Sequence, residues 1–436
     1  RAIALRGGSR GTRMRGRCSF NATAAARVTR LSAIPPAIFA RVVPLQGTTT
    51  ITVASGVATF TNLSHTVASA GTPITFDLTS NPPLGTVTST SVDVAAAAAS
   101  VATTIITASP TSISANGSAT STISVAVKDA FGNAKSSGET VALTTTLGAL
   151  GSVTYSGSGG IYNATLTAGL VSGTANIGGT LSAVAIVDSA AVTFTALPAT
   201  QYTVTSASSS VAAGTSVLVT AQLRDVNNNA VLTSGKTVSW SKTGTGGSFA
   251  TPTSLTDANG QAVISFTVHT LAGTVHTVTA TDNTALAGTS ANVAVVHAAA
   301  SQLVVTTQPS ASTVAGVAFA TQPVVTIRDA FGNTVTTGGD ATVTITASLT
   351  TGTGTLGGTL TKAAVAGVAS FSANGLNINL AGTDKVLTMA TTLSGPGAVT
   401  TTTSPAFTIT HAAASQIAVT TQPSASTVAG VAFATQ

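Results

Sequence analysis

The stretch "TISVAVKDAFGN" (residues 122–133) and the stretch "PVVTIRDAFGN" (residues 323–333) end in the same five residues. In both, apolar and polar residues alternate until the five residues "DAFGN" begin. Alternation with a period of two indicates a strand with one buried face and one face in water. An Asp that caps a turn, followed by a Gly in a left-handed conformation, suits the end of such a strand. The stretch therefore predicts a strand and turn that the chain uses more than once.

A third version of the turn, "RDVNNNAV" (residues 224–231), lies between these two. Its Asn228 stands where the others have Gly, and Asn is the non-Gly residue that best tolerates a positive φ. The Asp residues that head the three turns are 96 and 104 positions apart. We therefore predict a structural role for these turn residues: Asp129, Gly132, Asn133, Asp225, Asn228, Asn229, Asp329, Gly332 and Asn333.

Composition favours an all-β chain. Of the 436 residues, 43% are hydrophobic and only 6% are charged, and Gly occurs 42 times. Thr and Val, which favour strands, are abundant, and the alternation recurs at 217–223, 264–268 and 343–345. No uninterrupted apolar run approaches the roughly 18–20 residues of a membrane span. Short strands with frequent turn signals predict tandem immunoglobulin-like antiparallel β-sandwiches in an elongated array.

Internal repeats set the expected domain limits. Residues 297–322 and 411–436 differ at only two positions and are offset by 114 residues. Self-similarity of this kind indicates an array of domains. We predict an Arg-rich, disordered segment outside any domain (1–41), the C-terminal part of a truncated unit (42–98), three complete domains (99–198, 199–298 and 299–412) and the N-terminal piece of a further truncated unit (413–436).

The net charge of +6 comes from one end of the chain. Residues 1–41 hold nine of the 17 basic residues and no acidic residue, which leaves eight basic against 11 acidic residues in the remainder. A basic charge confined to one terminal segment does not predict nucleic-acid binding by the domains. The single Cys, Cys18, lies in the same segment, so disulfides and Cys-based zinc sites are excluded from residues 42–436.

The pattern V-x-[RK]-D-x-x-G-N, recurring about every 100 residues, resembles the bacterial immunoglobulin-like repeats of the invasin/intimin type found in very large surface adhesins. The resemblance covers roughly residues 42–436. It implies tandem β-sandwiches that form stalks outside the bacterial cell. None of the units resembles the C-type lectin-like tip domain on which receptor binding by invasins depends. The resemblance therefore does not imply receptor binding for this chain.

Candidate chemistry is sparse. Calcium at the "DAFGN" turns is a weak alternative, because one Asp and one Asn fall short of the six to eight oxygen ligands that the ion prefers. The five His residues show no metal-ligand spacing, and no Ser lies in a nucleophile-elbow motif. We therefore expect no enzyme, no cofactor and no metal site.

The sequence favours a non-catalytic structural spacer of a bacterial extracellular or cell-surface protein, whose partners are the neighbouring repeats. Two alternatives stay open. One is a module that binds a glycan or a host surface through its loops. The other is a stalk attached to an enzyme elsewhere in a longer protein.

Overall fold

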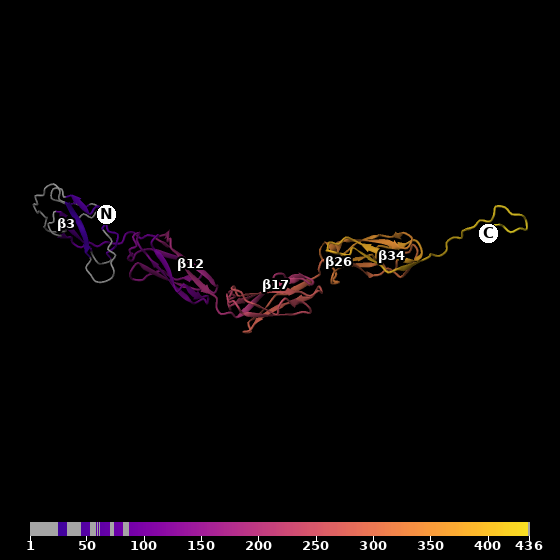
Figure 1. Cartoon of the computed structure of the whole chain (residues 1–436), viewed down its shortest axis with the longest axis horizontal. Coiled ribbons are helices and arrows are strands. Elements are labelled where there is room, and N and C mark those ends of the chain that lie inside the picture. Colours follow the sequence, from indigo (N-terminus) through magenta and orange to yellow (C-terminus); the bar gives the residue numbers. More distant parts are fainter. Residues whose placement is uncertain are drawn as a thin grey trace. The chain divides into compact units, whose positions relative to one another are not determined.

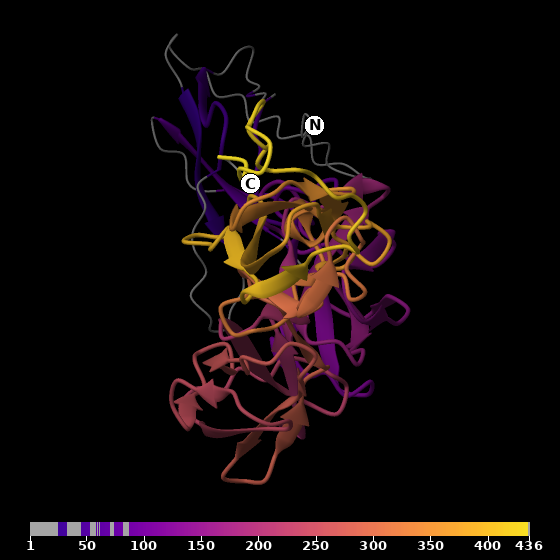
Figure 2. The same ribbon diagram turned by 90° about the vertical axis from the view of Figure 1, so that its right-hand side faces the viewer.

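The computed structural model describes residues 25–32, 45–52, 58, 60, 62–69, 74–81 and 87–434. In this part of the chain the secondary structure is almost entirely β, and its only helical element is a 3-10 turn, η1 (Gly339–Thr342). Figures 1 and 2 show strands joined by loops up to about residue 410, followed by a segment without strands. The predicted all-β class is confirmed, with tandem immunoglobulin-like sandwiches.

The chain divides into two compact units. The first contains residues 1–198 together with the turn Asp225–Ala230, and the second contains Ala199–Arg224 and Val231–Gln436. Four separate hydrophobic clusters lie along the sequence, within 45–94, 99–194, 199–298 and 300–409.

The most N-terminal sheet has the strand order β2-β1-β3-β4. Its strands are β1 (Ala25–Ser32), β2 (Thr50–Thr52), β3 (Thr75–Asn81) and β4 (Val87–Thr88). Strand β1 corrects the assignment of residues 1–41 to a segment outside any domain, because it pairs with both β2 and β3. A register shift between Val28 and Arg30 interrupts its alternation, which is why the sequence did not predict this strand. Residues 1–24 and 33–44, including Cys18, lie outside the described residues.

The first sandwich (β5–β14) has two sheets, β10-β11-β7-β5 with β9 on β11, and β13-β12-β14-β6 with β8 on β12. Ile123 and Val125 of β7 are fully buried, as the alternation predicts. The strands are β5 (Ile105–Ser109), β6 (Ser112–Ser114), β7 (Thr120–Ala126), β8 (Val141–Thr145), β9 (Ala149–Leu150), β10 (Thr154–Tyr155), β11 (Ile161–Thr167), β12 (Gly173–Leu181), β13 (Val184–Ala185) and β14 (Ala190–Thr195).

The second sandwich (β15–β25) has sheets β15-β17-β21-β19, β20-β18-β23-β24 and β16-β25-β22. Trp240 on β18 is 8% exposed and packs in the core. The strands are β15 (Gln201–Ser206), β16 (Ser210–Ala212), β17 (Ser216–Arg224), β18 (Thr237–Lys242), β19 (Ser248–Phe249), β20 (Thr253–Leu255), β21 (Gln261–Thr267), β22 (Val275–His276), β23 (Val278–Asp282), β24 (Ala287–Thr289) and β25 (Val293–Val296).

The third sandwich (β26–β36) has sheets β26-β28-β32 and β27-β36-β34-β29-β31, with β35 on β34 and a separate β30-β33 pair. Residues 411–434, which follow it, contain no strand and are almost all exposed. The strands are β26 (Ala300–Thr307), β27 (Ser312–Val314), β28 (Val324–Asp329), β29 (Thr344–Thr351), β30 (Leu356–Gly357), β31 (Thr361–Ala363), β32 (Val368–Ser370), β33 (Asn377–Ile378), β34 (Gly382–Ala390), β35 (Thr401–Thr403) and β36 (Phe407–Thr410).

One feature of the sheets differs from the antiparallel prediction. In each sandwich a short strand pairs in parallel with the last strand: β6 with β14, β16 with β25, and β27 with β36.

Candidate functional site

The three predicted turns have the same geometry. In the turn that follows β7, Asp129 Oδ1 accepts hydrogen bonds from the backbone N–H groups of Phe131 and Asn133, each 2.9 Å long. Gly132 has φ +87°, and its N–H donates back to the Asp129 carbonyl. Asp225 and Asp329 accept the corresponding bonds from the residues two and four positions later.

The residue at the fourth position of each turn adopts a left-handed conformation. Gly332 has φ +87°, as Gly132 does, and Asn228 has φ +65°. An L-residue other than Asn or Asp pays a steric penalty there, because its Cβ approaches the neighbouring carbonyl. The substitution of Gly by Asn at 228 therefore preserves the turn.

The second carboxylate oxygen of each Asp holds the segment that precedes the sandwich. Asp129 Oδ2 accepts a 2.8 Å hydrogen bond from the Ala97 N–H. Leu197 N–H donates to Asp225 Oδ2 at 2.9 Å, and Ala298 N–H donates to Asp329 Oδ2 at 2.8 Å. Each carboxylate therefore ties its own turn to the linker.

The Asn at the end of each turn reaches a loop of the preceding repeat. Its amide N–H donates to one backbone carbonyl, and its amide oxygen accepts from the backbone N–H two residues later. The partners are Thr66 and Ala68 for Asn133, Leu170 and Ser172 for Asn229, and Thr270 and Ala272 for Asn333, at 2.8–2.9 Å. We call each set of an Asp, its linker N–H, an Asn and the loop it reaches an Asp/Asn clamp.

The residue two places after each Asp adds a contact in two of the clamps. Phe331 lies over Gly214, where an added Cβ would come within 2.6 Å of the ring. Asn227 occupies the equivalent place in the middle turn, and its side chain donates to the Ala115 carbonyl at 3.3 Å. The loop that follows the short parallel strand is therefore part of the clamp surface.

The clamp keeps its three carboxylates ionised. Asp129, Asp225 and Asp329 are fully buried, and burial opposes the charged form. Hydrogen bonds from the clamp Asn and from backbone N–H groups outweigh that effect and lower the pKa of all three.

The same donors argue against calcium. Both oxygens of Asp129 face N–H groups, and the side chain of Asn133 is committed to Asp129 and the preceding loop. A cation needs lone pairs that point at it, which these donors occupy. The residues present do not fit a calcium site.

Two further Asp-headed turns in the second sandwich show what makes a clamp. Asp257 accepts the same two backbone bonds from Asn259 and Gln261, and Asp282 accepts them from Thr284 and Leu286. Neither turn has Asn four residues after the Asp. The Asn at that position therefore distinguishes a turn that also binds another repeat from an ordinary turn.

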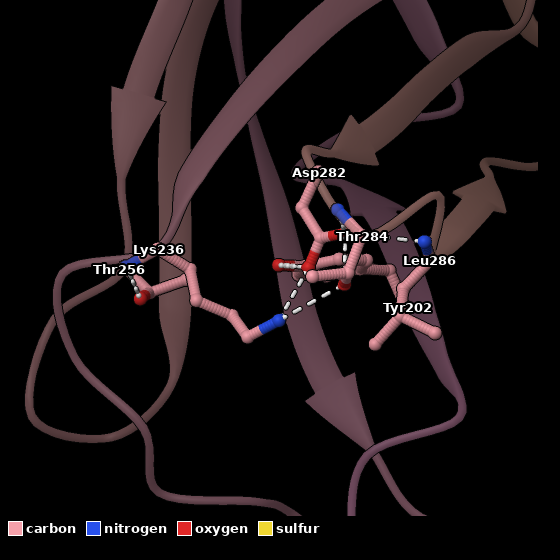
Figure 3. Close-up of polar contacts among 6 residues, drawn as sticks. All are labelled: Tyr202, Lys236, Thr256, Asp282, Thr284 and Leu286. Carbon is pink, nitrogen blue, oxygen red and sulfur yellow. Dashed lines mark hydrogen bonds and ion pairs between the residues drawn. The ribbon is translucent and has the colours of Figure 1, made fainter.

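In place of an Asn, Asp282 has a buried polar cluster around it (Figure 3). Lys236 Nζ lies 2.7 Å from Asp282 Oδ2, and the Tyr202 hydroxyl donates to the same oxygen at 3.3 Å. Thr284 donates to Oδ1 through both its backbone N–H and its hydroxyl. Burial would raise the pKa of Asp282, but the hydrogen bonds from Lys236 and Thr284 lower it to about 2. Burial and the Asp282 charge raise the pKa of Tyr202.

Three further observations concern the rest of the described residues. They hold no group of three or more His, Cys, Asp or Glu side chains that could bind a metal ion. No helix among them is long and apolar enough to span a bilayer. A hollow of about 540 Å³ lies beside the third clamp, lined by residues that include His297, Asn333 and Thr337. His297 bonds the Ala298 carbonyl and the Thr337 hydroxyl through its two ring nitrogens.

The sequence did not indicate the partners of the turns. The linker residues and loop residues offer only backbone groups, and a backbone partner carries no signature in the side-chain sequence. The usable signal was the Asn that ends all three turns but not the similar "TDANGQ" turn at 256–261.

Residues 99–197 match the family model "Invasin, domain 3". The adhesin InvE of Yersinia pseudotuberculosis is 26% identical with a TM-score of 0.27, and the match covers 45% of this chain and 60% of InvE. The Escherichia coli adhesin FdeC is 20% identical with a TM-score of 0.39, over 73% of this chain and 99% of that one. Invasin, described as a bacterial integrin-binding protein, is 17% identical with a TM-score of 0.35, over 89% and 72%. No curated protein gave a significant match.

Proposed function

Because residues 99–197 form an immunoglobulin-like domain of the invasin domain 3 type, we propose that this chain is the non-catalytic stalk of a bacterial surface adhesin. The complete domains span 99–198, 199–298 and 299–412. The chain acts outside the cell, and its principal partners are its own neighbouring repeats. The description of InvE and FdeC as adhesins supports the assignment to a surface protein.

The observation that carries the proposal is the recurrence of the Asp/Asn clamp. The loops that receive the three turns differ in sequence. Even so, each turn makes the same pair of hydrogen bonds from its Asn side chain to the preceding loop, and its Asp accepts the same hydrogen bond from the linker. A spacer needs joints that are the same from one repeat to the next. A site for an external ligand does not require this repetition.

The clamp resists bending because several hydrogen bonds of 2.8–2.9 Å join its turn to the linker and to the preceding loop. The Asn residues contribute two neutral hydrogen bonds each, worth about 0.5–1.5 kcal/mol apiece, and bonds to the charged Asp contribute about 1.5–3 kcal/mol. Breaking one clamp therefore costs several kcal/mol, which is far above thermal energy. The Asp charge is also held in place, since its four N–H donors belong to the turn, the Asn and the linker.

The experiment that tests the proposal is binding of the purified chain to arrays of glycans and of host extracellular-matrix proteins. A stalk gives no specific, saturable signal on either array. A saturable signal would instead support the alternative of a ligand-binding module. Among the features of the structure, the hollow beside His297 and Thr337 is the best candidate for a ligand site. The arrays are therefore also probed with the His297→Ala variant, which should lose any signal that arises from this hollow.

A further inference from the structure

The third sandwich presents the receiving half of an Asp/Asn clamp. The residues of this receiving half are identified from the equivalent positions in the other repeats. Ser69 N–H donates to the Val94 carbonyl, Gly173 pairs with Phe194 of β14, and Gly273 N–H donates to the Val295 carbonyl of β25. Gly382 pairs with Ile409 of β36 at the equivalent place. In the three occupied clamps, the backbone N–H that donates to the Asn side chain lies one position before Ser69, Gly173 or Gly273. The backbone carbonyl that accepts from the Asn side chain lies three positions before the same residue. The same count in the third sandwich gives Ala381 N–H and the Asn379 carbonyl.

The linker donor can be located by the same count. Ala97, Leu197 and Ala298 lie three residues after Val94, Phe194 and Val295, respectively, and each donates to a clamp Asp. Three residues after Ile409 is Ala412. Among the described residues, no hydrogen bond reaches Ala381 N–H, the Asn379 carbonyl or Ala412 N–H.

The surface around these groups matches an occupied site. The loop "NLAGT" (residues 379–383) differs at one residue from "TLAGT" (residues 270–274), which receives Asn333. Gly316 follows the short strand β27 as Gly214 follows β16, and the space above it is open where Phe331 covers Gly214. The residues 411–415 repeat 297–301 without change.

We infer that the loop Asn379–Ala381, together with Gly316 and Ala412, is a docking site for the Asp-Ala-Phe-Gly-Asn turn of a following repeat. The turn's Asn amide bonds the Asn379 carbonyl and the Ala381 N–H, its Asp accepts from Ala412, and its Phe covers Gly316. The inference rests on the proposed stalk function, but it concerns one junction and not the absence of an external ligand.

The test extends the full chain by a second copy of residues 323–412 after Gln436. Because 411–436 repeats 297–322 with two differences, this addition completes a repeat with its own turn. Amide hydrogen exchange is measured at Ala381 and Ala412 in the original and extended chains. We expect exchange at both to slow by roughly 10- to 100-fold, the range for gaining one or two hydrogen bonds. The control carries Asn333→Ala in the added copy only, and it restores fast exchange at Ala381.

A second variant needs no added sequence. Thr270→Asn in the original chain makes the occupied loop identical to 379–383. Retained slow exchange at Ala272 supports the docking role of that loop sequence, and loss of protection overturns it. Unchanged exchange at Ala381 in the extended chain also overturns the inference. The inference is also overturned if protection of Ala381 in the original chain rises with protein concentration. In that case the docking site is occupied by a turn of another copy of the chain. None of these results depends on the glycan and matrix arrays.

Discussion

Replacing Asn333 by Ala removes one arm of the third clamp and leaves the turn itself intact. The backbone bond from residue 333 to Asp329 Oδ1 does not use the Asn side chain, and it remains. The bonds that disappear are those to the Thr270 carbonyl, from the Ala272 N–H and to Asp329 Oδ2. The third sandwich should therefore stay folded while the loop 270–272 is released.

The size of the effect follows from the bonds lost between loop and turn. Two neutral hydrogen bonds at about 1 kcal/mol each give about 2 kcal/mol. Ala272 N–H is hydrogen-bonded through the Asn333 amide oxygen alone, so its exchange reports this interaction directly. A loss of about 2 kcal/mol accelerates exchange of the Ala272 amide roughly 30-fold.

The assay is native-state amide exchange followed by NMR, with Asn259→Ala as the matched control. Asn259 lies in a turn of similar sequence, but among the described residues its side chain hydrogen-bonds only Asp257 of the same turn. We expect the control to leave Ala272 unchanged. Unaltered exchange of Ala272 in Asn333→Ala, or equal acceleration in the control, would show that the Asn333 side chain does not hold this loop.

Three further predictions concern the turns and the buried ion pair. Gly332→Ala should lower the stability of the third sandwich by about 1–2 kcal/mol in urea denaturation through backbone strain. Gly332→Asn should be nearly neutral, because Asn228 adopts a left-handed conformation at the equivalent position; equal losses would contradict this. The lowered pKa of Asp282 means that its ionised form stabilises the fold above pH about 4 and that about 2 kcal/mol is lost as the pH falls toward 2. Asp282→Asn should flatten that part of the pH profile, and a profile unchanged by the substitution would refute the assignment. Lys236→Met leaves the buried Asp282 carboxylate without its cation, so we expect the free energy of unfolding to fall by about 2–3 kcal/mol. This is below the full value for a buried pair because the Lys236 side chain is 24% exposed. A fall of less than about 0.5 kcal/mol would show that the pair contributes little to stability.

The sequence predicted the strands that bury one face and expose the other to water. Alternation placed Val217, Val219 and Leu223 on one face of β17, and all three are buried. The tandem sandwich class followed from such strands and from the repeats. Strand β1 was not predicted, because a register shift disturbs its alternation and its Arg residues suggested a segment outside the fold.

The clamp was predictable only in part. The Asp-headed turn could be derived from the sequence, because side-chain capping and left-handed residues have strong residue preferences. Its reach into the preceding repeat could not, since the partners of Asn133, Asn229 and Asn333 are backbone groups. The Lys236–Asp282 pair joins residues 46 positions apart, and no local pattern links them.

We propose that the Asp/Asn clamp holds neighbouring repeats together. The most direct test measures the distance distribution between spin labels at Thr253→Cys and Thr361→Cys, two exposed positions on the second and third sandwiches, in a Cys18→Ser background. We predict a narrow distribution that broadens when Asp329→Ala and Asn333→Ala are combined. A distribution that is already broad without these substitutions, or that they leave unchanged, would contradict the claim.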